Sequence, residues 1–474
     1  MKLRLLVIFL LLLCSGVWAT DGYFSNGTGT KNKGLAGAGV AFLNNPASAA
    51  LNPAAISFNP NSGWNFEISV ALFNPIRQYK ITGTPTPPQN WGYIDPTGNF
   101  VPDARFSAFG LTPGTVESDK PLFFIPTLAI TYKLDEDNSF GLNVYGNGGM
   151  NTEYDAKTYY SEIIGAFPNP LPNGFPNPMV NVTSPTGVNL EQLFVSATYS
   201  RKLGDKHAIA VSPIFAYQSF EATGLQAFRD LGLAGPNTDF VTNNDAATST
   251  GFGFKIGYQG GIVENLRFGA FYQGEIDMSE FDDYKGLFAE EGDFNIPANW
   301  GAGVSYSINE DFSVMADVKS IMYSDVKAIA NGLDLMALQP QVPDLTDPTG
   351  AAFVANPNYK PLGSEDGAGF GWDDVMVYKI GAVYNANEDW TVRAGFSTGE
   401  MPITKENVLF NILAPAVNEN HISLGVTRKI GDKEINFAVT HALDADISGP
   451  NPLDPAQTIE LKMNQWEFEV GFGF

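Results

Sequence analysis

The chain has 474 residues, a net charge of −24, 49 glycines and an aromatic content of 13%. The negative charge argues against nucleic-acid binding, because the phosphate backbone would repel the protein. No stretch after the N-terminus approaches the roughly 20 consecutive apolar residues of a helical membrane span, which excludes a helical membrane protein. Aromatic and glycine enrichment without long apolar runs is typical of a transmembrane β-barrel, in which only every second residue faces lipid.

The first predicted element is a secretory signal peptide over residues 1–19. Lys2 and Arg4 precede an apolar run that is shorter than a membrane span, and small residues lead to a cleavage site after Ala19. The only cysteine, Cys14, would leave with this peptide. The mature chain is therefore expected to contain no disulfide.

The next predicted element, residues 20–61, is a plug for the barrel lumen. Its central part is rich in Gly, Ala and Asn, and small side chains allow backbone to pack closely in a confined space. Two Asn-Pro pairs, Asn45-Pro46 and Asn52-Pro53, favour tight turns. The alternative is an ordinary Gly/Ala-rich loop or a short helix packed on a soluble core.

The same segment carries a family resemblance. A Gly-Ala-Gly-x-Ala stretch with Gly37 and Gly39, followed by Asn52, Pro53 and Ala54, stands near the mature N-terminus and ahead of a long β-patterned chain. This arrangement resembles the FadL family of outer-membrane transporters of long-chain fatty acids and other hydrophobic compounds. The resemblance implies that these five residues belong to an N-terminal hatch inside the barrel.

Residues 62–474 are predicted to form the barrel. Segments about ten residues long alternate with period two, which is the length that a tilted strand needs to cross the hydrocarbon layer. In the first of them Trp64 and Phe66 lie on one face, and Asn65 and Glu67 on the other. The whole pattern predicts an all-β fold, a closed transmembrane antiparallel barrel of about 14 strands.

The connections between these strands fall into two length classes. Short polar turns are expected near residues 135, 205, 264, 310, 388 and 432. Seven long loops are expected near residues 75–121, 149–188, 221–248, 278–296, 326–369, 400–418 and 446–462. Strict alternation of the two classes predicts short turns in the periplasm, long loops outside and both termini on the periplasmic side.

A glycine-rich cluster follows the third strand. Gly146, Asn147, Gly148 and Gly149 weaken strand pairing and favour a bulge. In the FadL family an inward kink of the third strand opens the barrel wall sideways, so the resemblance implies a lateral opening at these residues. The alternative is that they begin an external loop.

Two of the long loops carry apolar residues at helical spacing. Exposed apolar side chains at loop tips are costly in water unless they pack on each other or on a ligand. The resemblance implies an external groove that captures hydrophobic ligand, and the alternative is the small core of two loop helices. The residues concerned are Leu225, Phe228, Leu231, Phe281, Leu287 and Phe288.

Cations inside the barrel are candidates for binding a ligand carboxylate. By strand alternation Arg393, Lys379, Lys255 and Lys319 all point inward. Barrel interiors are polar, so the alternative is that these side chains belong to a structural network of charges.

The sequence offers little support for an enzyme. None of its three histidines stands in a metal-binding motif, and His421, which points inward, has no nucleophile signature beside it. We therefore expect no catalytic residue, no metal and no cofactor.

The resemblance and the patterning together predict a monomeric barrel in the outer membrane of a Gram-negative bacterium, in contact with outer-membrane lipid and lipopolysaccharide. Its expected function is passive uptake of hydrophobic small molecules, long-chain fatty acids above all, by loop capture, luminal binding, hatch movement and lateral release. The alternatives are uptake of aromatic hydrocarbons by the same fold, a general porin for polar solutes, and an adhesin or purely structural barrel.

Overall fold

The computed structural model describes residues 21–87, 90, 92–94, 97–102, 111–155, 185–230, 232–344, 346–347 and 353–474. The predicted signal peptide lies outside these residues. The strands are β1 (Gly63–Thr82), β2 (Gly92–Ile94), β3 (Phe100–Pro102), β4 (Gly114–Glu117), β5 (Phe123–Lys133), β6 (Asn138–Tyr154), β7 (Thr186–Lys202), β8 (His207–Thr223), β9 (Ala247–Val263), β10 (Leu266–Gln273), β11 (Asp277–Met278), β12 (Asn299–Ser307), β13 (Phe312–Ile321), β14 (Gln341–Pro343), β15 (Phe353–Ala355), β16 (Val375–Asn385), β17 (Trp390–Gly399), β18 (Asn420–Ile430), β19 (Lys433–Asn451) and β20 (Asp454–Gly473).

The helices are short and lie outside the strands. None of those that the structure describes combines the length and the apolar character of a membrane-crossing helix. They are α2 (Thr30–Lys33), η1 (Pro46–Ala50), η2 (Pro53–Phe58), α4 (Gln226–Asp230), η5 (Gly235–Asn237), η6 (Asp282–Tyr284), α5 (Ala289–Gly292), η7 (Tyr323–Asp325), α6 (Lys327–Ala330) and η8 (Phe410–Ile412).

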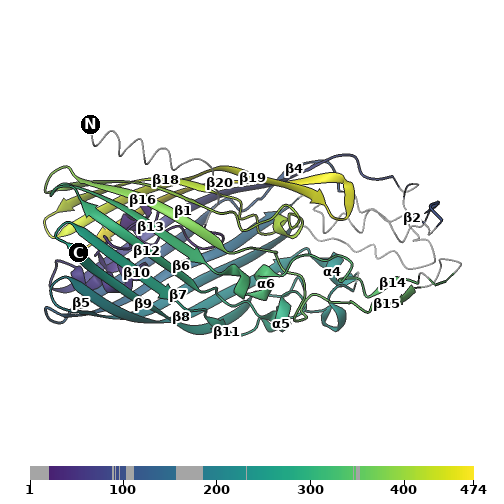
Figure 1. Ribbon diagram of the computed structural model, residues 1–474, viewed down its shortest axis with the longest axis horizontal. Helices are drawn as coiled ribbons and strands as arrows, with labels where there is room; N and C mark the ends of the chain where they lie inside the picture. Colours follow the sequence, from purple (N-terminus) through teal and green to yellow (C-terminus); the bar gives the residue numbers. More distant parts are fainter. Residues whose placement is uncertain are drawn as a thin grey trace.

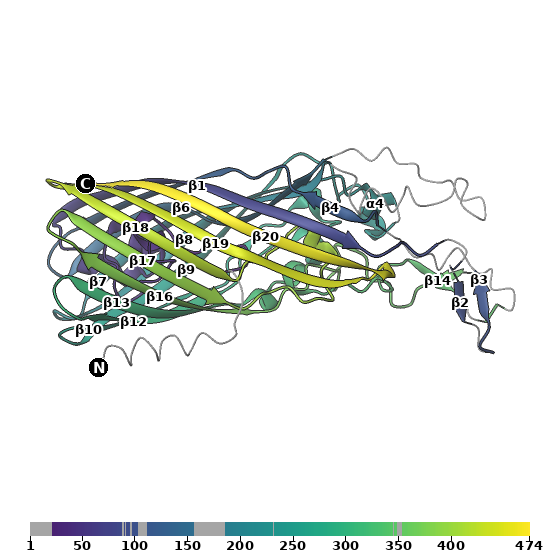
Figure 2. The same ribbon diagram turned by 90° about the horizontal axis from the view of Figure 1, so that it is seen from above.

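The strands close into one antiparallel barrel. Each barrel strand pairs with the next in chain order, and β1 completes the circle by pairing with β20. Setting aside the short strands β4 and β11, the barrel has 14 strands, so the predicted fold class is confirmed. The strands run obliquely to the long axis of the molecule (Figures 1 and 2).

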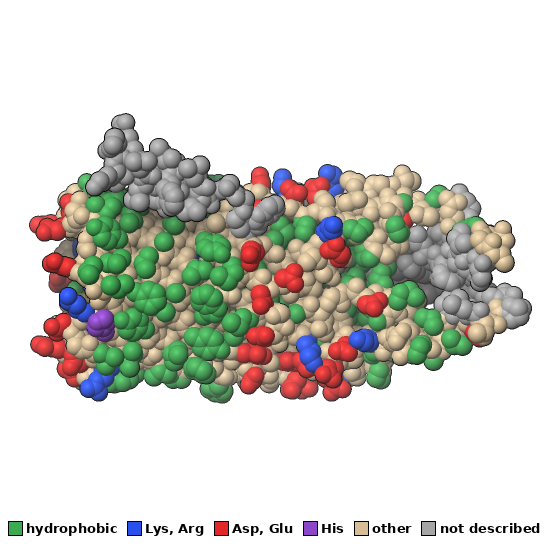
Figure 3. All heavy atoms as spheres, viewed as in Figure 1, with side chains coloured by type: hydrophobic (Ala, Val, Ile, Leu, Met, Phe, Trp, Pro, Cys, Tyr) green, Lys and Arg blue, Asp and Glu red, His purple; other side chains and the backbone are tan. Residues whose placement is uncertain are grey.

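Alternation along each strand separates an outer apolar face from an inner polar face. In β1, Trp64 and Ile68 are exposed, whereas Asn65, Glu67 and Ser69 are buried. Apolar side chains gather over the part of the barrel near the C-terminus, with charged side chains at both margins (Figure 3). This is the band that a hydrocarbon layer covers, and the lumen keeps the polar residues.

The six short turns lie where the sequence predicts them. They occupy residues 134–137, 203–206, 264–265, 308–311, 386–389 and 431–432. Asn309 shows why such sequences turn, because its side-chain oxygen accepts the backbone N–H groups of Asp311 and Phe312 at 3.0 and 2.8 Å. All six turns join strands that neighbour each other in the barrel wall.

The prediction of a seventh long loop near residues 446–462 is wrong. β19 and β20 continue as a paired hairpin to Asn451 and Asp454, so the connection has two residues. Ile459 and Leu461 are buried, so the alternation of inward and outward side chains continues through this region. The region is therefore strand and not loop. The first loop also begins later than predicted, because β1 runs to Thr82.

The described parts of the remaining long connections gather at the end of the barrel away from the C-terminus (Figure 1). Their apolar side chains form a core of their own, in which Phe220 of β8 packs on Phe281, Tyr284 and Phe288. The described parts of these loops therefore form a packed cap and not a set of separate exposed segments.

The N-terminal segment, residues 21–59, lies inside the barrel near the end with the short turns (Figures 1 and 2). Its helix α2 contacts β18, β19 and β20, and η1 and η2 contact β5 to β9. The inner wall has glycines where this backbone comes closest. A Cβ on Gly395 would lie 2.0 Å from the carbonyl carbon of Leu35, so a larger residue does not fit there.

Candidate functional site: a luminal cavity at a break in the wall

β6 leaves its neighbour on one side only. Its register with β5 runs from Lys133↔Ser139 to Thr127↔Tyr145 and then stops, in strands that the structure describes throughout this region. On the other side β6 stays paired with β7 up to Tyr154, with a bulge between Gly146 and Gly148. The wall is thus unpaired between the first residues of β5, 123–126, and the second half of β6.

The N-terminal segment takes up part of the pairing that β6 loses. Phe24 forms an isolated bridge with Gly148, the Ser25 N–H donates to the Asn147 carbonyl at 2.8 Å, and the Gly149 N–H donates to the Tyr23 carbonyl at 3.1 Å. Because buried backbone groups need partners, these bonds stabilise the bent strand. They also fix the N-terminal segment beside the break.

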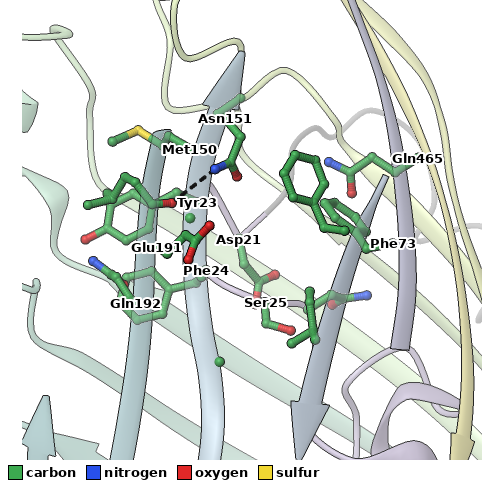
Figure 4. A pocket seen from close by; sticks show the side chains of 18 of the residues that line it. Asp21, Tyr23, Phe24, Ser25, Phe73, Met150, Asn151, Glu191, Gln192 and Gln465 are labelled. Atoms are coloured by element: carbon green, nitrogen blue, oxygen red, sulfur yellow. Dashed lines mark hydrogen bonds between the residues drawn. The ribbon is translucent and has the colours of Figure 1, made fainter. Parts of the chain in front are cut away.

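A cavity of about 670 Å³ lies at this break. In Figure 4, Tyr23, Phe24 and Gln192 lie on one side of it, with Phe73 and Gln465 across from them. Its lining includes luminal residues and also side chains on the outer face of the wall, namely Leu122, Phe124, Leu193 and Tyr217. The cavity therefore reaches from the lumen to the lipid-facing surface.

The predicted hatch residues shape the N-terminal segment. Asn52 donates to the carbonyls of Val40 and Tyr258, both at 2.9 Å, and accepts the Ala54 N–H at 3.1 Å. Pro53 follows as the first residue of η2, where its missing N–H is harmless.

Gly37 and Gly39 adopt positive φ angles of 79° and 127°. This left-handed conformation is open to glycine at low cost. It lets the Gly39 and Val40 N–H groups both donate to the Asp317 carboxylate of β13, at 2.6 and 3.0 Å.

The four predicted luminal cations all point inward and are buried or nearly so. Each of them binds another group of the protein. Lys319 and Lys379 both form ion pairs with Asp21, at 2.9 and 3.1 Å. Lys255 donates to the Ala50 carbonyl at 2.6 Å. Arg393 donates to the Thr427 hydroxyl at 2.6 Å. In this conformation the three lysines hold the N-terminal segment.

The residues predicted to capture ligand do not form an exposed groove. Leu225, Phe228, Phe281 and Phe288 are buried in the loop core, and Leu287 packs against it. The sixth residue, Leu231, lies outside the described residues. Packing these side chains on each other removes more apolar surface from water than a groove would. The five described residues therefore fit the alternative interpretation, the core of the loops.

Sequence reasoning missed several cavity residues. Asp21, Tyr23 and Phe24 precede the Gly/Ala-rich stretch, and Arg77 falls within the long loop that the sequence predicts near residues 75–121. The alternation that places Arg77 on the inner face of β1 continues through Tyr79 and Ile81, both buried. Following that alternation past residue 75 would have identified Arg77.

No catalytic constellation emerges at the site. The Ser397 hydroxyl lies 3.3 Å from Nδ1 of His421, and it is also 3.4 Å from the Asn26 amide oxygen, as in a polar network. Within the described ranges, no group of three or more His, Cys, Asp or Glu side chains is placed to hold a metal ion.

Comparison with known proteins gives a family and a fold. A family model described as outer membrane protein transport protein (OMPP1/FadL/TodX) matches residues 184–451. No curated protein matches the chain in a sequence comparison. The P. putida toluene transporter TodX is a similar solved structure, with a TM-score of 0.59, 19% identity, and coverage of 94% of this chain and 98% of TodX.

Two further solved structures are similar. A Pseudomonas aeruginosa FadL homologue has a TM-score of 0.61 and 16% identity, covering 96% of this chain and 99% of that one. The Ralstonia pickettii toluene transporter TbuX has a TM-score of 0.56 and 18% identity, covering 94% and 98%. At these identities the likeness concerns the fold.

Proposed function

Since the chain belongs to the OMPP1/FadL/TodX family of outer-membrane transport proteins, we propose that it carries hydrophobic small molecules, long-chain fatty acids in particular, passively across the outer membrane. The observation that supports this most is the cavity, which runs from the lumen to the lipid-facing side chains Phe124 and Leu193. A polar solute gains nothing from a path that ends in hydrocarbon. A hydrophobe does, because transfer into an apolar environment is favourable.

In this proposal the N-terminal segment is the hatch. Ligand enters through the loop cap, reaches the cavity above the N-terminal segment, and leaves sideways between β5 and β6. Tyr23 and Phe24 line the cavity and also bond to β6, so their movement links ligand binding to the state of the break. No energy source is needed, since differential binding sets each step and the gradient sets the direction.

The lateral step is tested by a disulfide across the break. A Cβ on Gly146 would lie 3.0 Å from a methyl carbon of Ile125, so these two residues are in contact across the break. We expect the Ile125→Cys/Gly146→Cys pair, once oxidised, to lose most uptake of a radiolabelled long-chain fatty acid in reconstituted vesicles. Reduction should restore it. Residues 21–474 contain no other cysteine.

The matched control is Leu128→Cys/Val144→Cys, which joins residues already paired in the β5–β6 ladder. Oxidation of this pair should leave uptake unchanged. Undiminished uptake in the oxidised Ile125–Gly146 pair would rule out the lateral route. Equal passage of small sugars in all variants would indicate a porin, and transport of toluene without fatty acid would assign the hydrocarbon alternative.

A further inference from the structure

The cavity contains one arginine side chain that has no acidic partner among the residues the structure describes. Among the described lining residues, Arg77 is the only lysine or arginine. It lies on β1 opposite Met463 of β20, its backbone carbonyl accepts the Ser118 N–H at 2.9 Å, and its side chain is 5% exposed. A guanidinium so far removed from water needs compensation by hydrogen bonds or by an opposite charge.

The surroundings of Arg77 supply only part of that compensation. Its Nη1 atom is buried and has no hydrogen-bond partner among the described residues. The nearest assigned interaction is with a ring, since the guanidinium carbon lies 5.7 Å from the centre of Phe123. A cation–π contact of this kind uses the face of the guanidinium and leaves its N–H groups available.

The acidic residues of the cavity do not fill this role. Asp21 is engaged by Lys319 and Lys379, and Glu467 is paired with Lys33 of α2. The third, Glu191, is exposed and accepts a hydrogen bond from Asn189 at 3.4 Å. Among the described residues, Arg77 is thus a buried positive charge that no acidic side chain of the cavity neutralises.

We propose that Arg77 binds the carboxylate of the transported molecule, and that the cavity therefore favours hydrophobic carboxylates over neutral hydrocarbons. This inference rests on the proposed function of hydrophobe transport. The guanidinium fork matches the two oxygens of a carboxylate, and the bond is charge-assisted. The apolar chain of the ligand then lies along Phe73, Phe123 and Met150, which line the same cavity.

The test compares two probes of equal chain length, laurate and dodecanol, on the full-length mature protein in lipid nanodiscs. Arg77→Met keeps an unbranched apolar side chain of similar length and removes the charge. We expect wild type to bind laurate about tenfold more tightly than dodecanol, as suits a hydrogen bond to a charged group. Arg77→Met should lose that preference and bind dodecanol as wild type does, whereas Arg77→Lys should keep part of it.

The matched control is Arg428→Met, because Arg428 pairs with Asp389 at the short-turn end of the barrel, away from the cavity. It should keep the full preference. Heat-modifiable gel migration checks that each variant is folded, and Arg77→Gln replaces Arg77→Met if the latter does not fold.

Each other outcome overturns the inference. An unchanged preference in Arg77→Met would mean that water satisfies Nη1 and that the carboxylate binds elsewhere. Equal loss of both probes would mean that Arg77 only supports packing. Equal binding of both probes by wild type would exclude recognition of the carboxylate while leaving hydrophobe transport intact. Binding of neither probe by wild type would remove the proposed function as well.

Discussion

Single buried charges hold the N-terminal segment in the lumen. Asp21 is 1% exposed and receives ammonium groups from both Lys319 and Lys379. Burial raises the pKa of the Asp21 carboxyl, but the charges of the two lysines lower it by more, so the pKa lies below the ordinary value. The carboxylate is therefore ionised at neutral pH, and the ion pairs are intact there.

Replacing Asp21 with Asn should loosen the N-terminal segment. Removing one partner of a buried ion pair costs roughly 3–5 kcal/mol, because the other charge stays buried without compensation. We expect faster hydrogen exchange over residues 21–33 and a higher conductance in planar bilayers. Asp432→Asn, in an exposed turn, serves as the control, and equal exchange in both variants would contradict the ion-pair account.

The Asp21 carboxyl also makes the attachment of the N-terminal segment depend on pH. Because the folded-state pKa of Asp21 is lower than the ordinary 3.8, its contribution is present above that value and is lost as the pH falls through the folded-state pKa. Acidification from pH 7 to pH 3 should therefore lower the hydrogen-exchange protection factors of residues 21–33, which are corrected for the intrinsic pH dependence of amide exchange, more in wild type than in Asp21→Asn. An equal loss of protection in both proteins would assign the effect to other carboxylates.

For single residues, the sequence predicts the direction of a side chain better than it predicts the group that the side chain binds. Alternation alone is sufficient to place Lys379 and Lys319 in the lumen, because side-chain direction in a strand is local. That both bind Asp21 depends on how a segment some 300 residues earlier enters the barrel. No local sequence pattern carries that information. The sequence therefore predicts ligand binding for lysines that, in the structure, bind Asp21.

At the scale of elements, β6 determines the shape of the site. It is a continuous strand from Asn138 to Tyr154, yet it exchanges one partner, β5, for the backbone of Tyr23 to Ser25. Gly148 makes this exchange sterically possible, because a Cβ there would lie 2.0 Å from the Tyr23 carbonyl oxygen.

Gly148→Ala should therefore separate the N-terminal segment from β6. The clash is with backbone, so it is relieved only by moving Tyr23 and giving up the hydrogen bonds of Asn147 and Gly149, each about 1 kcal/mol. Limited proteolysis should cut within residues 21–30 faster than in wild type. Gly261→Ala, whose Cβ would meet nothing closer than 3.6 Å, should behave as wild type. Unchanged proteolysis of Gly148→Ala would show that the bridge to β6 is dispensable.

Element boundaries were predicted well at the short turns and poorly at the other end. The turns are fixed by local side-chain bonds such as those of Asn387, which accepts the N–H groups of Asp389 and Trp390, both at 3.0 Å. The outer ends of β1, β19 and β20 are fixed by pairing between distant segments, for example Ile81 with Ile459. Their length therefore could not be read from any one strand.

At the scale of the whole molecule, the connections differ at the two ends of the barrel. Short turns close one end, and the loop core caps the other (Figure 1). Even strand number and closure followed from the sequence, because alternation recurs in every segment. The buried state of Phe281 and Phe288 did not, since helical spacing describes a loop core and a ligand groove equally well.

Orientation in the membrane is tested by epitope insertion. A tag between Pro452 and Leu453 lies at the tip of the β19–β20 hairpin, and a tag between Gly431 and Asp432 lies in a short turn at the opposite end. Short turns are periplasmic in outer-membrane barrels. Antibody added to intact cells should therefore bind the first tag, and bind the second only after permeabilisation. The reverse pattern would invert the orientation.

The position of the N-terminal segment constrains how the barrel is assembled. Residues 21–59 lead directly into β1, and β1 pairs with β20, the last strand of the chain. The segment emerges before all the barrel strands during synthesis, yet the wall around it is complete only when the final strand is in place. An unclosed, curved sheet can receive the segment along its open edge, whereas a closed barrel can receive it only through one end. Entry of the segment before closure leaves it enclosed by the wall, whereas closure before entry leaves the lumen without it.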